Sequence, residues 1–306
     1  MDRDMKESRS LSGILRSQGK RHWVEAQAGE HLGTQGRIWD GYVHHWRDRA
    51  VVGRLLPESD YDTGKPIVLL WPAAFDDRSQ TSHFQLYLNE RLTQFRGSIL
   101  GHSAINVGGW VFNFSYRSIE NEVLPVEEYL YRPALGPFGV HPSLGRVNEA
   151  LDEKPYNNNF GRLFARSIHV LDVETHEEVV ARLFSFFRAT MRVIHKAPVN
   201  PDAPTFNSYF HYYRRNCATI IRDGLRRTGM FPVRGLTPRD LFESAYRVFR
   251  RAEKRGECRL KYGKMEQLKV PEAPYSAEVS PLNPLNRARH ILGMGISPLD
   301  SSGPLS

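Results

Sequence analysis

The chain has 306 residues, of which 40% are hydrophobic and 25% are charged; this composition is typical of a globular protein and excludes a disordered chain, a collagen or a coiled-coil rod. The longest nearly continuous apolar run, residues 67–75, contains a proline and is too short for a transmembrane helix, which needs about 20 apolar residues. The formal charge is +8, and residues 214–264 hold 15 Lys and Arg against 5 Asp and Glu. Such a basic segment either attracts polyanions or forms a solvated surface.

Both ends of the chain are predicted to lie outside the folded core. Residues 1–35 are polar and lack sustained periodicity, which predicts a flexible arm. They also lack an apolar signal segment, so we expect a protein that is made in the cytoplasm and exported, if at all, without a signal peptide. Residues 272–306 are rich in proline and predict a flexible tail. The folded domain is expected to span residues 36–271.

Several helices and strands can be predicted inside that domain. The short apolar run Pro66–Trp71 predicts a buried strand, and apolar residues spaced by four and three over residues 82–95 predict a helix. A longer stripe predicts a second helix over residues 174–195, with acidic residues at its start. Further helices are expected after Asn216 and from Thr237, both of which are good N-cap residues. Helices combined with the hairpin described next predict an α+β fold.

A β-hairpin is predicted around the dipeptide Gly108-Gly109, because glycine readily adopts the positive φ angles of a two-residue hairpin turn. The expected pairs are Val107 with Trp110, Ile105 with Phe112 and Ser103 with Phe114. This register places His102 opposite Ser115 and diagonal to Asn113, on the second face of the hairpin. A histidine fixed through one ring nitrogen by Asn or Ser has the geometry of a general base. The alternative is a histidine on a solvated sheet face.

A cysteine is predicted in the first turn of a helix, because Asn216 is a good N-cap and Cys217 follows it. The helix dipole and the neighbouring Arg214 and Arg215 are expected to lower the pKa of the Cys217 thiol. Backbone N–H groups at the same helix end could hold an oxyanion. The alternative is an inert buried thiol. The second cysteine, Cys258, lies in a charged stretch and is assigned no role.

These two motifs together resemble the circularly permuted branch of the papain-like fold, which includes the lecithin:retinol acyltransferase relatives and the permuted relatives of the NlpC-type cell-wall peptidases. The histidine motif GHSAINVGG precedes the cysteine motif YYRRNCATIIRDGL, as in that branch, and the later TPRDL is also similar. The resemblance covers roughly residues 66–245, with an insertion near 116–206. It implies that Cys217 is the nucleophile, His102 the base and Asn113 the orienting residue, with Ser115 as the alternative.

The resemblance implies a cysteine-dependent hydrolase or acyltransferase and leaves its substrate open. We expect a lipid acyl ester, because permuted relatives often act on acyl lipids and the basic segment favours an anionic bilayer. A peptide amide of peptidoglycan is the alternative. Either substrate would suit an antibacterial toxin or effector of the target-cell envelope, with an export machinery and an immunity protein as partners. The aromatic cluster at residues 209–213 is either core or the wall of an acyl groove.

A non-enzymatic interpretation remains open beside this one. The Arg-rich helices from Arg222 to Lys264 could clasp nucleic acid or anionic lipid, with Cys217 incidental, although nucleic acid is not the favoured partner. The sequence contains no glycine-rich phosphate loop, no HExxH motif and no cysteine pair at metal-ligand spacing. We therefore expect neither a cofactor nor a metal.

Overall fold

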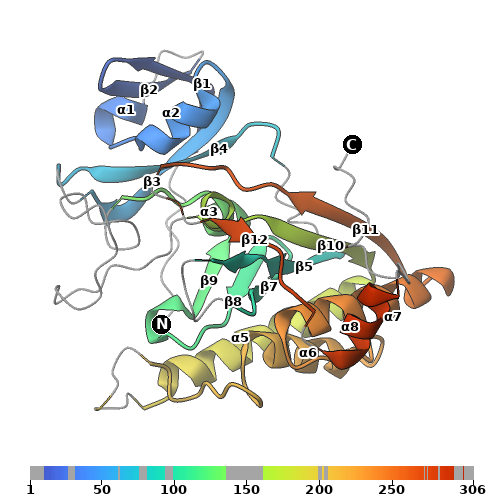
Figure 1. Ribbon diagram of the computed structural model, residues 1–306. Helices are drawn as coiled ribbons and strands as arrows, with labels where there is room; N and C mark the ends of the chain where they lie inside the picture. Colours follow the sequence, from blue (N-terminus) through green and yellow to red (C-terminus); the bar gives the residue numbers. More distant parts are fainter. Residues whose placement is uncertain are drawn as a thin grey trace. The chain divides into compact units, whose positions relative to one another are not determined.

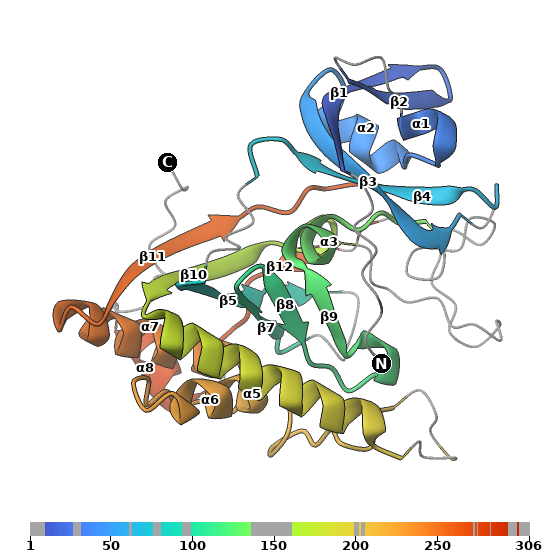
Figure 2. The ribbon, with the colours of Figure 1, turned by 180° about the vertical axis from the view of Figure 1, so that it is seen from behind.

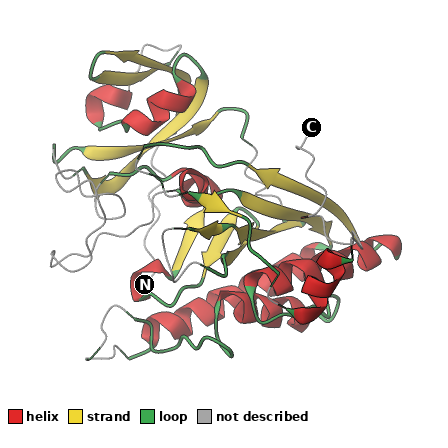
Figure 3. Cartoon of the chain, viewed as in Figure 1, coloured by secondary structure: helices red, strands yellow, loops and turns green. Residues whose placement is uncertain are grey.

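The computed structural model describes residues 10–26, 32–60, 63–75, 81–93, 99–135, 161–198, 202, 206–271, 273, 275–281, 283–292 and 299. The chain is mixed α+β with antiparallel sheets (Figures 1 and 3). It divides into two compact units. Unit 1 comprises Met1–Asp76, Glu127–Ala165 and Leu268–Ala273, and unit 2 comprises Asp77–Val126, Arg166–Gln267 and Pro274–Ser306.

Unit 1 contains a four-stranded antiparallel sheet in the order β2-β1-β3-β4. Its strands are β1 (Leu11–Gln18), β2 (Arg21–Glu25), β3 (Ala50–Ser59) and β4 (Pro66–Pro72), and its helices are α1 (Leu32–Gln35), α2 (Asp40–Trp46) and α4 (Arg162–Ala165), while α3 (Val126–Tyr131) begins at the boundary with unit 2. An aromatic cluster forms its core, made of Trp39, Tyr42, Trp46, Tyr131 and Phe164. The strand predicted at Pro66–Trp71 is confirmed as β4.

The N-terminal segment is not the flexible arm that was predicted. Residues 11–25 form β1 and β2, and Leu15 lies opposite Val24 with both side chains fully buried. The prediction failed because apolar residues are sparse in this segment, so that each strand alone shows little periodicity. The apolar side chains of β1 and β2 become buried because the two strands pair with each other, and the sequence does not reveal this pairing. Residues 1–9 and 27–31 lie outside the described part of the chain.

Unit 2 contains a six-stranded sheet in the order β11-β10-β5-β7-β8-β9, with every pair antiparallel. These strands are β5 (His83–Asn89), β7 (His102–Val107), β8 (Trp110–Asn113), β9 (Glu122–Pro125), β10 (Ile168–Thr175) and β11 (Cys258–Met265). The helices are α5 (Glu177–Lys196), α6 (Cys217–Arg227), α7 (Pro238–Lys254) and α8 (Pro284–Ile291), and β6 (Arg91–Leu92) pairs with β12 (Ser276–Ala277). Helices α5, α6 and α7 lie along one side of this sheet, and their apolar faces share one core with it (Figure 2).

The helix predicted over residues 82–95 is wrong, because His83–Asn89 form β5 and Arg91–Leu92 form β6; residues 94 and 95 lie outside the described part. The central strand β5 lies between β10 and β7 and is buried on both faces. A strand of this kind carries a continuous apolar run, which can contain helical spacings by coincidence. The helices predicted after residue 174, after Asn216 and from Thr237 are confirmed as α5, α6 and α7. Helix α5 begins later than predicted because Glu174 belongs to β10.

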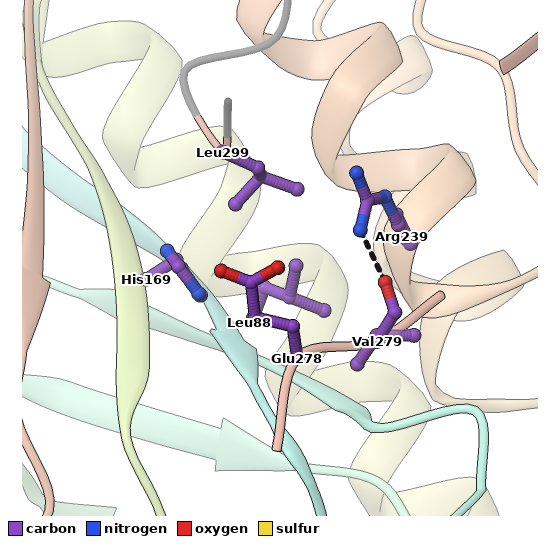
Figure 4. A pocket seen from close by; sticks show the side chains of 6 residues that line it. All are labelled: Leu88, His169, Arg239, Glu278, Val279 and Leu299. Atoms are coloured by element: carbon purple, nitrogen blue, oxygen red, sulfur yellow. Dashed lines mark hydrogen bonds between the residues drawn. The ribbon is translucent and has the colours of Figure 1, made fainter. Parts of the chain in front are cut away.

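The C-terminal segment is not a flexible tail in its described part. Arg239 of α7 donates a hydrogen bond to the carbonyl of Val279, and Asn286 of α8 donates to the Asp240 carboxylate at 2.9 Å. These bonds hold the segment against α7 within unit 2. A small pocket remains beside it, lined by Leu88, His169, Arg239, Glu278, Val279 and Leu299 (Figure 4). Residues 293–298 and 300–306 lie outside the described part.

Candidate functional site

The predicted hairpin is confirmed in its turn and in most of its register. Gly108 and Gly109 have φ angles of 60° and 87°, as a turn with two positive φ angles requires. Val107 pairs with Trp110 and Ile105 with Phe112. The ladder ends at Asn113, which lies opposite Ala104. The further pairs predicted at Ser103 and His102 are therefore not part of it.

The face of the hairpin that carries His102 is not a solvated face. Ala104, Asn106 and Asn113 are each fully buried, and His102 at the start of β7 is half-buried. A buried polar face needs internal hydrogen-bond partners, because unpaired buried polar groups are costly. Asn106 accordingly donates to the Gln85 side chain at 3.0 Å. The interpretation of His102 as a residue on a water-facing sheet is wrong.

Asn113 orients the imidazole of His102. Its amide oxygen Oδ1 lies 2.6 Å from His102 Nε2, and its amide nitrogen Nδ2 donates to the backbone carbonyl of Glu120 at 2.7 Å. Because the nitrogen is committed to that carbonyl, the atom facing the imidazole must be the oxygen, which only accepts. Nε2 therefore carries the proton, and in the neutral ring Nδ1 is the basic nitrogen.

The loop after β8 holds Asn113 in this orientation. The Ser115 hydroxyl donates to Glu120 at 2.7 Å, so this hydroxyl supports the loop, whereas Asn113 contacts the histidine. Asn121 closes the loop like a strand partner, since its Oδ1 accepts from Ser115 N and its Nδ2 donates to Ser115 O, both at 3.0 Å. These bonds end β8 and fix the carbonyl of Glu120 that Asn113 needs.

The predicted helix start at Cys217 is confirmed, and Asn216 builds it. Asn216 Oδ1 accepts from the backbone N–H of Thr219, while the Thr219 hydroxyl accepts from the backbone N–H of Asn216, so that a reciprocal capping box forms. Asn216 Nδ2 also donates to the carbonyls of Tyr212 and Leu236. One side chain thus ties the helix start to the loop before it and to the segment before α7, which fixes the position of Cys217.

The thiol of Cys217 lies against the backbone N–H of Ser103, the residue after His102. This contact follows from the hairpin. The residues that flank a two-residue turn, here Val107 and Trp110, form a hydrogen-bonded pair, and every second residue along the strand directs its N–H to the same side. Ser103 lies four residues before Val107, so its N–H also points toward the side of β8. Since β8 has ended opposite Ala104, that N–H lies just beyond the ladder. Helix α6 packs against β7 and brings the sulfur to this open edge.

The pKa of the Cys217 thiol is raised, which corrects the prediction of a lowered pKa. Burial raises it, while the backbone N–H groups of Ser103, Ala218 and Cys217 and the charge of Arg166 lower it to a smaller extent. The neighbouring Arg214 and Arg215, on which the prediction relied, are exposed. The thiol is therefore protonated at neutral pH unless a base takes its proton.

The aromatic residues before Cys217 are divided between core and surface. Tyr209 packs against the core of unit 2, whereas Tyr212 and Tyr213 are 68% and 75% exposed. The interpretation of the whole cluster as core is therefore wrong for these two residues. They precede the start of α6, where Cys217 is half-buried.

Two residues of this region escaped the sequence analysis. Arg166 is buried, donates to the carbonyl of Glu90 at 3.0 Å and supplies the positive charge that acts on the Cys217 sulfur. Asn121 fixes the loop behind Asn113. Neither belongs to a recognisable motif, because each acts through neighbours that are distant in sequence or through a loop conformation.

No group of three His, Cys, Asp or Glu side chains within the described ranges is arranged to hold a metal ion. None of the helices in those ranges combines the length and hydropathy that crossing a bilayer would need. Neither a protein-family model nor any curated protein or solved structure matches the chain. Its function is therefore inferred from the geometry of unit 2.

Proposed function

We propose that unit 2 is a cysteine-dependent acyl hydrolase or acyltransferase with a permuted papain-like arrangement, in which Cys217 is the nucleophile, His102 the base and Asn113 the orienting residue. The observation that carries this proposal is the hydrogen bond from His102 Nε2 to Asn113 Oδ1, with the amide orientation fixed by the carbonyl of Glu120. This pair prepares a basic Nδ1 one residue away from the backbone N–H that contacts the sulfur.

In the first half of the reaction, Sγ of Cys217 attacks the carbonyl carbon while its proton passes to Nδ1 of His102. The imidazolium keeps its Nε2 proton on Asn113. The negative charge that develops on the carbonyl oxygen is held by backbone N–H groups at the start of α6. When the tetrahedral intermediate collapses, the bond to the leaving group breaks, the leaving group takes the proton from Nδ1, and a thioester remains on Cys217.

In the second half, water or another acceptor attacks the thioester after giving a proton to Nδ1 of His102. The carbon–sulfur bond breaks, and Sγ takes the proton back. Ester and amide substrates share these steps, so the residues named here define the acyl chemistry. The same His102–Asn113 pair is needed in both halves, first to accept a proton and then to release it.

The non-enzymatic alternative leaves this constellation unexplained. A protein that only binds polyanions has no need for a half-buried imidazole of fixed tautomer one residue before the backbone N–H that contacts the Cys217 sulfur. The basic segment is also partly committed to internal ion pairs, including a buried one between Arg239 and Glu243 at 2.8 Å. Charge alone therefore gives weaker support for that function.

The test is product analysis with the full chain. The protein is incubated separately with mixed phospholipids and with purified peptidoglycan sacculi, and released fatty acid or peptide is measured by mass spectrometry. We expect release from one of these substrates, with Cys217→Ala and His102→Ala inactive but folded by circular dichroism. Full activity in Cys217→Ala would refute the proposal. Cys258→Ala is the matched control, because this second cysteine lies in β11, contacts the carbonyl of Phe249 and has no role in the candidate site.

A further inference from the structure

Exposed apolar side chains, most of them aromatic, gather next to the candidate site. We call this set the aromatic rim, and it consists of exposed Phe206, Tyr212, Tyr213 and Leu236 and of half-buried Phe210. The ring of Tyr116 contacts those of Phe206 and Phe210, with centroid distances of 5.7 Å and 6.0 Å. The ring of Phe210 in turn lies 5.2 Å from that of Tyr212, centroid to centroid. Phe206 is 49% exposed and Leu236 51%. Exposed aromatic residues gathered in this way mark an interaction surface.

The aromatic rim borders both halves of the site. Asn216, the residue before the nucleophile, donates hydrogen bonds to the carbonyls of Tyr212 and Leu236. At the other end of the rim, Tyr116 directly follows Ser115 in the loop that holds Asn113. Residues 206–216, which carry most of the rim, run back along α5 to the start of α6 (Figures 1 and 2). A molecule bound to the rim would therefore lie beside the start of α6, where Cys217 is half-buried.

Two exposed arginines accompany the rim, and helix stability does not explain them. Arg214 and Arg215 precede α6, where the helix dipole disfavours positive charge. Other basic residues of the segment, such as Arg251 and Lys254, lie in the last turn of α7, where the dipole favours them. Within the described residues neither Arg214 nor Arg215 forms an ion pair with a carboxylate. The guanidinium of Arg215 lies 4.7 Å from the ring centroid of Tyr209.

We infer that the aromatic rim, with Arg214 and Arg215, docks on an anionic lipid surface and presents acyl lipid to Cys217. Tyrosine and phenylalanine side chains suit the boundary between headgroups and acyl chains, where one end is wet and the other apolar. Each arginine near an anionic leaflet adds attraction. Nucleic acid fits less well, because its affinity comes mainly from phosphate contacts with many Lys and Arg side chains, whereas the rim is accompanied by two arginines. The choice of a lipid substrate rests on the proposed acyl chemistry, whereas docking itself does not.

The test is co-sedimentation of the full chain with vesicles of phosphatidylcholine alone or with added phosphatidylglycerol. We expect binding only to the anionic vesicles. Arg214→Ser/Arg215→Ser should weaken it by roughly 30-fold, because about 1 kcal/mol per arginine corresponds to about fivefold each. Tyr212→Ser/Tyr213→Ser should also weaken it through the loss of interfacial contact. The control Arg251→Ser/Lys254→Ser removes the same charge elsewhere and should bind almost as the wild type does.

Docking is overturned if the rim variants bind anionic vesicles as tightly as the wild type, or if the control loses as much affinity as the arginine variant. It is also overturned if a single-stranded oligonucleotide competes fully with the vesicles, which would make the surface a general polyanion site. Cys217→Ser should still bind vesicles. If Cys217→Ser is inactive but the rim does not bind vesicles, the acyl chemistry stands and the lipid surface is refuted. If the rim binds vesicles but Cys217→Ser keeps full activity, the lipid surface stands and the acyl chemistry is refuted.

Discussion

The reactivity of Cys217 should depend on His102, because the surroundings of the thiol do not ionise it by themselves. Burial raises the pKa of Cys217, and three backbone N–H groups and Arg166 compensate only in part. The reactive thiolate must therefore form by transfer of the proton to the imidazole. Replacing His102 by Ala removes the acceptor and leaves the backbone of β7 in place.

The second cysteine provides an internal scale for the size of this effect. Burial, followed by the charges of Glu253 and Glu257, raises the pKa of Cys258 to about 11. At pH 7 such a thiol is ionised to roughly one part in 10,000. The pKa of Cys217 is raised as well, so little thiolate is present without a base, and a positioned general base typically contributes a factor of about 100 or more. His102→Ala should thus slow alkylation of Cys217 by about 100-fold or more.

The assay is alkylation by iodoacetamide, with both cysteine peptides quantified by mass spectrometry between pH 6 and pH 8. In the wild type, Cys217 should react faster than Cys258 already at pH 6 to 6.5, because only Cys217 has a base beside it. The Cys258 rate should rise roughly tenfold per pH unit. Asn113→Ala should slow Cys217 as well, and Ser115→Ala should slow it less, because the Ser115 hydroxyl supports the loop and does not contact the imidazole. An unchanged Cys217 rate in His102→Ala would refute the proton transfer.

Three further predictions concern stability, measured by urea unfolding. Asn216→Ala removes the helix cap and two donated hydrogen bonds and should cost about 2–3 kcal/mol. Burial raises the pKa of Glu90, but hydrogen bonds from His169 and Ser276 and the Lys264 charge lower it to about 2. The ionised carboxylate should therefore stabilise the fold by about 3 kcal/mol above pH 4.5, and this stability should be lost as the pH falls toward 2. Glu90→Gln should abolish this pH dependence. Gly224→Ala places a methyl group 2.5 Å from the Phe187 ring and should destabilise by about 1–3 kcal/mol.

Local signals made the elements that carry the candidate site predictable. The Gly108-Gly109 turn sets the hairpin register by itself, because its backbone angles exclude most other residues. Asn216 caps α6 and Thr237 caps α7 through bonds that span only three residues. The fold of these segments depends on neighbours within one turn of helix or one pair of strands, which is why the sequence alone reveals them.

The elements that were missed depend on contacts between distant segments. Whether residues 82–95 form a strand or a helix is decided by β10 and β7 on either side of β5. The burial of Leu15 and Val279 is likewise provided by partners that no local pattern identifies. The pKa of Cys217 was misjudged for the same reason, since the sequence reveals the helix start and the adjacent Arg215 but not the burial of the sulfur.

Burial of Cys217 has opposite effects on the resting thiol and on the reacting one. In the resting protein it disfavours the thiolate, which lowers the population of the nucleophile. During attack, however, negative charge leaves the sulfur and develops on the carbonyl oxygen, and fixed N–H dipoles in a poorly solvated site stabilise that charge more strongly than they would in water. This arrangement is productive only if a base of fixed tautomer removes the thiol proton during attack. The His102–Asn113 hydrogen bond meets that requirement, so the raised pKa of Cys217 makes the pair necessary and does not argue against the proposed chemistry.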